Sequence, residues 1–413
     1  MTAAVNLFKG VCSEFTPIEM DLLSVVEMLD EGHPFIERFA RRGVIVNFDE
    51  RAALEAAGRA ACAHPHAISL SICPTIGCNF DCPYCFQDHS SGKMPSEVQD
   101  DVVSLAERMM DGAGVKNLDV TWFGGEPLLY PGIIESLSGR LMQLVAARGG
   151  DYTAMIITNG YLLTQENVDM LSRCQVNLAQ VTIDGLGATH DATRHLRGGG
   201  PTFERIVGNL RDVRIPFKVD VRHNVYEGNR GAMNVLESFI ERLSEESGNE
   251  LHYYCAPVTG SPTADERGKQ VDLLHDDESE VGTRREADRF RVGRGSFCMA
   301  HSIWSVGVDA DGNLYRCRGA IDKPRFSFGT AHDWDPADPL ATASSPDNLT
   351  MYLNTACPVP DEECRECVWL PLCVGGCPHD RLTKGRSCVS FKDEPESYVL
   401  ALHARMIGAR IEP

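Results

Sequence analysis

The sequence lacks the features that would place a protein in a membrane or on a nucleic acid. No apolar stretch approaches the length that spans a bilayer, and the opening residues lack the charged start and apolar run of a secretory signal. Basic residues are also scarce, since 39 Lys and Arg compare with 59 Asp and Glu, a net charge of −20. Nucleic-acid binding requires a basic surface, so we expect a cytoplasmic protein that binds neither nucleic acid nor membrane.

Cysteine, in contrast, is abundant, with 16 among the 413 residues. In a secreted protein so many cysteines would indicate disulfides, and in a reducing cytosol they indicate metal ligands. Because we expect no secretory signal, we interpret most of them as thiolate ligands.

Three cysteines near residue 80 have the spacing C-x3-C-x2-C: Cys78, Cys82 and Cys85. A closed structural metal site needs four protein ligands, whether it holds zinc or a four-iron cluster. Three thiolates on a four-iron cluster leave one iron open for a substrate or cofactor. The motif therefore predicts a centre that performs chemistry, although by itself it is also compatible with a zinc site.

From residue 68 onward, β-rich apolar runs alternate with amphipathic helical stretches. This alternation predicts βαβ units and a parallel sheet. Six such units predict an α/β fold, an open (β/α)6 partial TIM barrel over residues 67–257. In barrels of this kind the active groups gather at the carboxyl ends of the strands, where the three-cysteine loop would lie. The predicted strands are 68–73, 118–123, 153–158, 178–183, 217–225 and 251–256.

The segments outside the barrel differ in composition. Residues 1–66 predict a small helical or winged-helix-like unit in the order helix, helix, strand, helix, or alternatively an irregular extension. Its first helix begins with a capping box at Thr16-Pro17-Ile18-Glu19, and Val44 to Val46 are its candidate strand. Residues 258–297 are polar and charged and predict a linker. A cysteine-rich domain at 298–395 and a helix at 396–413 complete the prediction.

Further polar and glycine-containing motifs occur at the ends of the predicted strands. Glycines allow a backbone to approach a ligand closely, a carboxylate can accept hydrogen bonds from an ammonium group, and a guanidinium can pair with a carboxylate. The residues concerned are Gly124, Gly125, Glu126 and Pro127 after the second strand, Asn159 after the third, Thr182 at the end of the fourth and Arg222 in the fifth.

The cysteine spacing, the tyrosine before the third cysteine and the GGEP run together resemble the radical S-adenosylmethionine (SAM) superfamily over residues 68–256. The resemblance implies that Cys78, Cys82 and Cys85 hold a [4Fe–4S] cluster whose open iron binds the amine and carboxylate of SAM. Reductive cleavage of SAM would then give a 5′-deoxyadenosyl radical, which abstracts hydrogens that acid–base side chains cannot remove. The implied SAM contacts are Gly124, Gly125, Glu126, Pro127, Asn159, Thr182 and Arg222.

Seven cysteines between residues 298 and 388 resemble the SPASM extension of radical SAM enzymes, whose members bind two auxiliary clusters. For one of these two clusters, the resemblance supplies only three cysteine ligands: Cys298, Cys317 and Cys377. Cys357 is the preferred fourth ligand and Cys255 the alternative; otherwise that cluster is open to water or substrate. Without the first motif, zinc would be expected here. The implied sets are Cys364, Cys367, Cys373 and Cys388 for one [4Fe–4S] cluster, and Cys298, Cys317 and Cys377 for the other.

Enzymes with this extension mostly modify peptides or proteins. The resemblance therefore implies a maturase of a ribosomally synthesised peptide that installs a thioether or carbon–carbon crosslink or an oxidation. Its implied partners are a precursor peptide and an electron donor such as flavodoxin or ferredoxin. Residues 1–66 are the candidate for binding the leader of the precursor by strand addition, and the alternative is that a separate protein recognises the leader.

Two alternatives remain open, a sulfatase-maturing enzyme and a non-catalytic iron–sulfur electron carrier or scaffold. Sulfatase-maturing enzymes carry an aspartate base directly after the second SPASM cysteine, where this chain has Arg318. This departure disfavours the sulfatase interpretation. The intact three-cysteine motif and the GGEP run argue against a mere scaffold.

Overall fold

The computed structural model describes residues 2–6, 11–30, 32–42, 44–46, 49–50, 52–53, 56, 65–89, 92–258, 298–356, 362–386, 388 and 392. The chain divides into two units, which we describe separately. The barrel unit comprises Cys62–Asp276 and Met299–Asn354, and the terminal unit comprises Met1–Ala61, Asp277–Cys298 and Thr355–Pro413.

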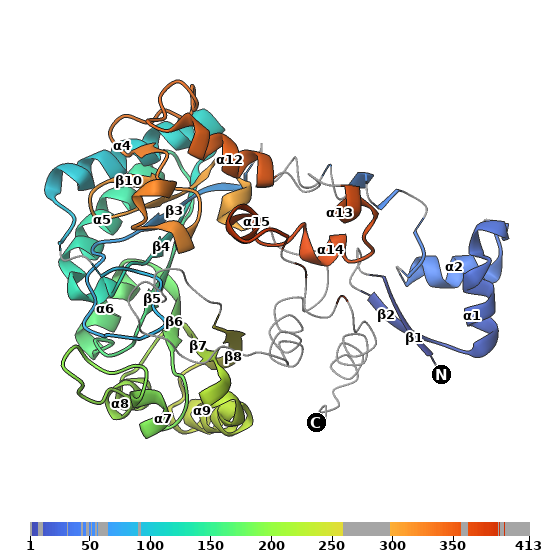
Figure 1. The fold of residues 1–413 in the computed structure, drawn as a ribbon, viewed down its shortest axis with the longest axis horizontal. Helices are drawn as coiled ribbons and strands as arrows, with labels where there is room; N and C mark the ends of the chain where they lie inside the picture. The colour runs from blue at the N-terminus through green and yellow to red at the C-terminus, as the bar shows by residue number, and fades with distance from the viewer. Residues whose placement is uncertain are drawn as a thin grey trace. The chain divides into compact units, whose positions relative to one another are not determined.

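A nine-stranded sheet with the order β11-β10-β9-β3-β4-β5-β6-β7-β8 forms the barrel unit (Figure 1). The strands from β3 to β8 are parallel and pair in chain order. This arrangement confirms the predicted (β/α)6 partial barrel, and each predicted strand lies within two residues of an observed one. These strands are β3 (Ala67–Ile72), β4 (Asn117–Trp122), β5 (Tyr152–Thr158), β6 (Val176–Thr182), β7 (Lys218–Val225) and β8 (Leu251–Pro257).

The sheet continues beyond the predicted barrel into the cysteine-rich region. β9 (Ser305–Val308) pairs in parallel with β3, so that Ser69 lies opposite Ser305. β10 (Asn313–Tyr315) and β11 (Gly329–Thr330) then add antiparallel strands. An open barrel leaves the backbone groups of its first strand unpaired, and β9 satisfies them. Part of the predicted 298–395 domain is therefore built into the barrel sheet.

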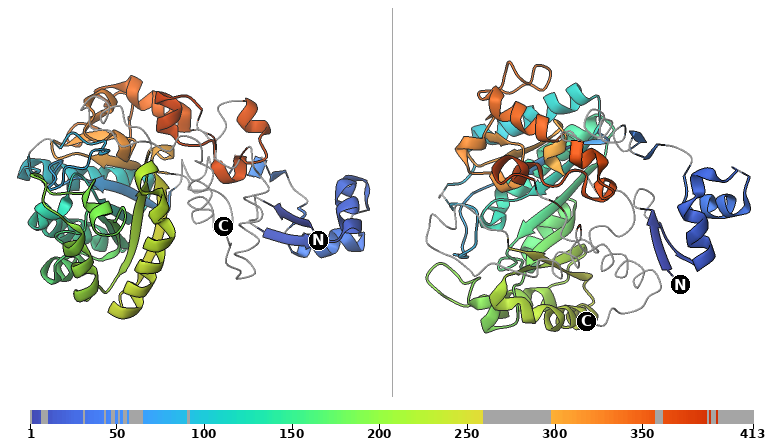
Figure 2. Two further views of the ribbon diagram at one scale, coloured as in Figure 1. Left: turned by 60° about the horizontal axis from the view of Figure 1, so that its bottom comes forward. Right: turned by 45° about the vertical axis from the view of Figure 1, so that its right-hand side comes forward.

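Helices follow the parallel strands and cover one face of the sheet (Figures 1 and 2). Their apolar sides pack on the strands to form one large core that includes Val102 and Leu105 of α4 and Trp122 of β4. The helices are α4 (Ser96–Ala113), η2 (Pro127–Leu129), α5 (Pro131–Ala147), α6 (Gln165–Arg173), α7 (Ala188–Asp191), α8 (Phe203–Asp212), η3 (Glu227–Ala232), α9 (Met233–Ser247), η4 (Met299–His301), η5 (Arg318–Ala320), η6 (Pro324–Phe326) and α12 (Pro346–Ala356).

The terminal unit begins with a hairpin that the sequence did not predict. β1 (Thr2–Asn6) and β2 (Val11–Phe15) pair antiparallel. α1 (Pro17–Ser24) follows with the predicted capping box, which is confirmed by the reciprocal bonds of Thr16 and Glu19. Next come η1 (Val26–Met28) and α2 (Pro34–Arg41).

The predicted strand at Val44 to Val46 is wrong. The N–H groups of Val44 and Ile45 donate to the Phe39 carbonyl oxygen at the end of α2, at 2.9 and 3.4 Å. Both side chains pack on the Phe35–Phe39 cluster. The backbone N–H groups of Val44 and Ile45 are therefore hydrogen-bonded, and their side chains partly buried, without a partner strand.

The carboxyl-terminal part of the terminal unit contains three short helices, α13 (Glu362–Glu366), α14 (Leu370–Cys373) and α15 (Pro378–Thr383). The predicted helix at 396–413, almost all of the predicted linker and Cys357 lie outside the described residues. None of the helices in the described part of the chain combines the length and the apolar character needed to span a bilayer.

Candidate metal centre

The loop after β3 carries the three-cysteine motif to the carboxyl end of the barrel strands. Cys82 is buried, and Cys78 and Cys85 are half-buried. Burial raises the pKa of the Cys82 thiol to about 12, and the charge of Cys85 adds to the effect although Arg194 opposes it. The pKa of Cys78 is also raised by burial, and then by Glu126, Cys82 and Cys85.

The three cysteines lie in one loop, buried or half-buried, and the charges of Cys82 and Cys85 act on Cys78. Buried thiols stay protonated unless a cation replaces the proton. The donor set therefore fits an iron–sulfur cluster, whose irons would stabilise the thiolates. Among the described residues, no three His, Cys, Asp or Glu side chains are arranged to hold a single metal ion. A cluster does not require that arrangement, since each thiolate binds a different iron.

The glycines of the GGEP turn bring the end of β4 against the cysteine loop. A Cβ atom on Gly124 would lie 2.2 Å from the Thr75 carbonyl oxygen, and one on Gly125 would lie 2.2 Å from that of Gly77. Gly124 also has a φ of 126°, in the region that favours glycine. The N–H groups of Gly125 and Glu126 donate to the Thr75 and Gly77 carbonyl oxygens, at 3.2 and 2.9 Å. Because these two glycines have no side chain, the GGEP turn can approach the cysteine loop closely enough for backbone hydrogen bonds.

Glu126 is fully buried and connects the ends of β4 and β5. Its carboxylate accepts from the N–H groups of Leu128 at 2.9 Å and Asn159 at 2.7 Å. Thr158 Oγ1 lies 2.8 and 2.9 Å from its two oxygens. Burial raises the pKa of Glu126, and these bonds partly offset the rise. The carboxylate is fixed in place, and its charge acts on Cys78.

The structure brings some of the other predicted SAM contacts to the cysteine loop. Asn159 Nδ2 donates to Asn79 Oδ1 at 2.7 Å and lies 3.9 Å from Cys78 Sγ. Pro127 begins η2 and is buried. Thr182 is buried at the end of β6 opposite Arg222 of β7, whose Nε donates to Asn224 Oδ1 at 2.7 Å. Asn159 is therefore directly beside the motif, whereas Arg222 is held by its own strand.

A buried network that the sequence did not reveal joins Tyr84, Asp184 and Arg194. The Tyr84 hydroxyl donates to Asp184 Oδ2, and Arg194 Nη1 donates to the Tyr84 oxygen at 2.9 Å. Burial raises the pKa of both Asp184 and Tyr84, while the charge of Arg194 lowers each. Because Arg194 also lowers the pKa of Cys82, the network places a cation beside the motif. In the sequence, the Asp184-Gly185 pair at the end of β6 marks a strand end, but no sequence feature indicates that Asp184 contacts Tyr84.

His190, in the short helix α7 after β6, is fully buried and has a structural role. Its Nδ1 accepts from the Asp184 N–H at 3.2 Å, and its Nε2 lies 3.1 Å from Thr202 Oγ1. Burial lowers the pKa of His190 well below the ordinary value, so the ring is neutral. It fixes the backbone of Asp184.

In the terminal unit, one small pocket gathers a full set of predicted auxiliary-cluster cysteines. Burial raises the pKa of Cys373 to about 11, and the charges of the other three cysteines contribute. Two cations reach the thiols, since Arg381 Nη1 is 3.5 Å from Cys364 Sγ and Lys392 Nζ is 3.8 Å from Cys388 Sγ. The four cysteines lining the pocket are Cys364, Cys367, Cys373 and Cys388.

The cysteines assigned to the other auxiliary cluster are divided between the units. In the terminal unit, Cys298 lies close enough to Cys377 for its charge to raise the pKa of that thiol, which burial raises first. In the barrel unit, Cys317 follows β10 and packs against the cluster containing Cys73. Cys255 is buried in β8.

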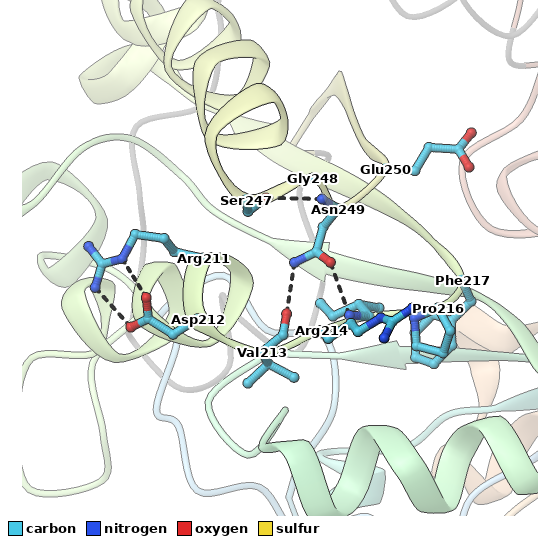
Figure 3. A pocket seen from close by; sticks show the side chains of 11 residues that line it. Arg211, Asp212, Val213, Arg214, Pro216, Phe217, Ser247, Gly248, Asn249 and Glu250 are labelled. Carbon is cyan, nitrogen blue, oxygen red and sulfur yellow. Dashed lines mark hydrogen bonds and ion pairs between the residues drawn. The ribbon is translucent and has the colours of Figure 1, made fainter.

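A pocket at the opposite end of the barrel strands is not a candidate site (Figure 3). It lies between the segments 211–217 and 247–250, which precede β7 and β8. Asn249 fills its centre, donating to the Val213 carbonyl oxygen at 2.8 Å and accepting from the Ile215 N–H at 3.0 Å. Arg211 pairs with Asp212 at 2.8 Å. These polar groups satisfy one another and connect two turns.

Comparisons with known proteins agree with this location of the site. The sequence model of the radical SAM superfamily matches residues 72–221. The sporulation killing factor maturation protein SkfB of Bacillus subtilis is 30% identical over 180 residues, 43% of this chain and 38% of SkfB. A cysteine-type anaerobic sulfatase-maturating enzyme of Clostridium perfringens is 26% identical over 368 residues, 80% of this chain and 94% of that enzyme.

The fold is similar to that of SuiB of Streptococcus suis, solved in complex with its precursor peptide SuiA. The TM-score is 0.55 at 13% identity, with 94% of this chain and 99% of that chain covered. At this identity the likeness concerns the fold. The matched superfamily region contains the cysteine loop, the GGEP turn and the Asp184 network.

Proposed function

We propose that the protein, whose residues 72–221 match the sequence model of the radical SAM superfamily, is a cytoplasmic peptide maturase. The observation that carries this proposal is the backbone junction between the cysteine loop and the GGEP turn, which fixes Glu126 beside Cys78. A [4Fe–4S] cluster with SAM, when bound here, supplies a 5′-deoxyadenosyl radical that abstracts hydrogen from a peptide residue.

The residues of this chain would hold those groups in defined ways. Cys78, Cys82 and Cys85 would bind three irons. Glu126, together with the backbone of Gly124 and Gly125, would receive the ammonium group of SAM. Because Glu126 is already hydrogen-bonded and buried, it would bind without rearrangement.

A peptide substrate is supported by two features of the terminal unit. The pocket of Cys364, Cys367, Cys373 and Cys388 suits a [4Fe–4S] cluster that accepts the surplus electron of an oxidative modification. In the described residues, β1 and β2 pair only with each other, so each offers a free edge. An extended leader peptide could add there as a third strand. SkfB is a maturation protein, and SuiB has been solved with its precursor peptide.

The second candidate function is maturation of a sulfatase, which the extensive match to the Clostridium perfringens enzyme favours. The position of Arg318 disfavours maturation of a sulfatase. Arg318 Nε donates to Ser71 Oγ at 3.0 Å, so a cation stands where the base is expected. Asp322, four residues later, pairs with Lys323 at 2.9 Å and accepts from the Asp88 N–H.

The iron content of the protein tests the cluster assignments. Full-length protein reconstituted anaerobically should contain about 12 irons per chain, since three cubane clusters are proposed. The double variant C364A/C388A should lose about four irons and keep the remainder, because it removes half the ligands of one cluster only. Iron and zinc are measured by mass spectrometry of the elements. Bound zinc, or four irons or fewer in the wild type, would contradict the three-cluster assignment.

Coexpression with a precursor peptide encoded beside the gene tests the function itself. The modified peptide should have lost two hydrogen atoms, as a crosslink or oxidation requires. Tandem mass spectrometry would locate the change, and coexpression with C78A should leave the peptide unmodified. An unmodified peptide alongside conversion of a sulfatase cysteine or serine to formylglycine would replace the proposal with the second candidate.

A further inference from the structure

His89 lies four residues after Cys85, and its ring returns to that thiol. Nε2 of His89 is 3.1 Å from Cys85 Sγ, and the residue is only 7% exposed. Its backbone is left-handed, with a φ of 53°. Few residues other than glycine adopt this conformation, and it persists where the surroundings impose it. The strained backbone directs a buried imidazole at one sulfur of the motif.

The segment that carries His89 is anchored on both sides. Arg197 Nη2 donates to the His89 carbonyl oxygen at 3.4 Å. The neighbouring Asp88 donates its N–H to Asp322 Oδ2 at 2.9 Å and pairs with Lys323 at 2.8 Å. The ring therefore meets Cys85 in a preformed geometry.

We infer that His89 donates a hydrogen bond from Nε2 to the Cys85 sulfur and thereby raises the reduction potential of the cluster in the three-cysteine motif. A metal-bound thiolate carries no proton and can only accept, so the hydrogen must be on Nε2. The neutral ring and the imidazolium both meet this requirement. The inference rests on the proposed function in one respect, namely that a [4Fe–4S] cluster occupies the motif.

The charges around the motif explain why such a donor would matter. Glu126 acts on Cys78 through a buried negative charge, whereas at Cys82 the cation Arg194 acts more strongly than the anion Asp184. Buried anions disfavour the electron that reduction adds to a cluster, whereas hydrogen bonds to its sulfurs stabilise the reduced form. The donor at Cys85 would act together with Arg194 in offsetting the negative charge of the carboxylates. It would keep the potential within reach of a flavodoxin or ferredoxin.

Three variants of the reconstituted full-length protein test this role. His89→Phe keeps a planar ring but removes the donor, and His89→Gln returns an N–H group at a similar reach. His195→Phe is the matched control, because its Nδ1 contacts the Leu196 carbonyl oxygen rather than a thiol. The readout is the midpoint potential of the EPR signal that changes when SAM is added.

At a fixed ambient potential, His89→Phe should lower the ratio of reduced to oxidised cluster about tenfold, which is 59 mV for a one-electron couple. His89→Gln should stay within about twofold of the wild type, and His195→Phe should not change the potential. A wild-type potential in His89→Phe would overturn the inference. Loss of about four irons in that variant would also overturn it, since His89 would then be a ligand.

The readout separates this inference from the proposed function. The potential is measured without SAM cleavage or a peptide, so a wild-type value in His89→Phe leaves the maturase proposal intact. If the maturase proposal is wrong, the EPR signals of the wild-type protein should not respond to SAM.

Discussion

The triple variant C78A/C82A/C85A should form no detectable 5′-deoxyadenosine from SAM with dithionite as the reductant. The three cysteines share the loop after β3, and the charges of Cys82 and Cys85 raise the pKa of Cys78. Removing them takes away every cysteine ligand of the cluster that is proposed to reduce SAM. The product is quantified by liquid chromatography with mass spectrometry.

Two comparisons make this result specific. Cys174→Ala removes a buried thiol at the end of α6. Cys174 precedes β6 and therefore lies away from the carboxyl ends of the strands. The Cys174→Ala variant should retain SAM cleavage. C364A/C388A should retain SAM cleavage better than peptide modification, because the cluster proposed at those cysteines is not the one that binds SAM. Unchanged 5′-deoxyadenosine formation in the triple variant would refute the assignment of the radical source.

A single methyl group at Gly125 should have nearly as large an effect. The added Cβ would lie 2.2 Å from the Gly77 carbonyl oxygen and 2.3 Å from that of Ile76. Both contacts are with backbone, so the GGEP turn has to move away from the cysteine loop. A displacement of about 1 Å at a reacting centre can cost about a hundredfold in rate. We expect Gly125→Ala to lower the rate of SAM cleavage by at least about that factor.

Gly139→Ala is the matched control, because nothing lies within 4 Å of a Cβ at that position of α5. Alanine within a helix should stabilise the protein by about 0.5–1 kcal/mol, and activity should be unchanged. Thermal unfolding monitored by circular dichroism would show that both variants fold. If Gly125→Ala bound and cleaved SAM as the wild type does, the backbone junction would have no part in positioning Glu126.

The parts of this site that the sequence predicts are those encoded locally. The spacing of the three cysteines and the alternation of strands and helices are each contained within short windows, and both predict correctly where the loop lies. Gly124 and Gly125 were also singled out, as positions where backbone approaches a ligand. The structure shows a further reason for them, since the backbone they admit is that of residues 75–77.

The parts that the sequence does not reveal depend on long-range pairing. Tyr84 meets Asp184 and Arg194 only because β3 and β6 belong to one sheet. The β1–β2 hairpin consists of two five-residue strands, too short for a clear alternation. The sequence does not indicate a role for His89, because a histidine four residues beyond a motif carries no signal until a left-handed backbone returns its ring to Cys85.

The pairing of β3 with β9 has a consequence for how the protein is made. β3 is synthesised early, yet one of its two hydrogen-bonding partners, Ser305–Val308, follows more than two hundred residues later. At typical rates of synthesis the ribosome needs roughly 10–50 s to cover that distance. During this interval the nascent chain presents the strand that leads into the cysteine loop with one side open to other chains. The barrel is therefore completed, and this strand protected, only after most of the protein has left the ribosome.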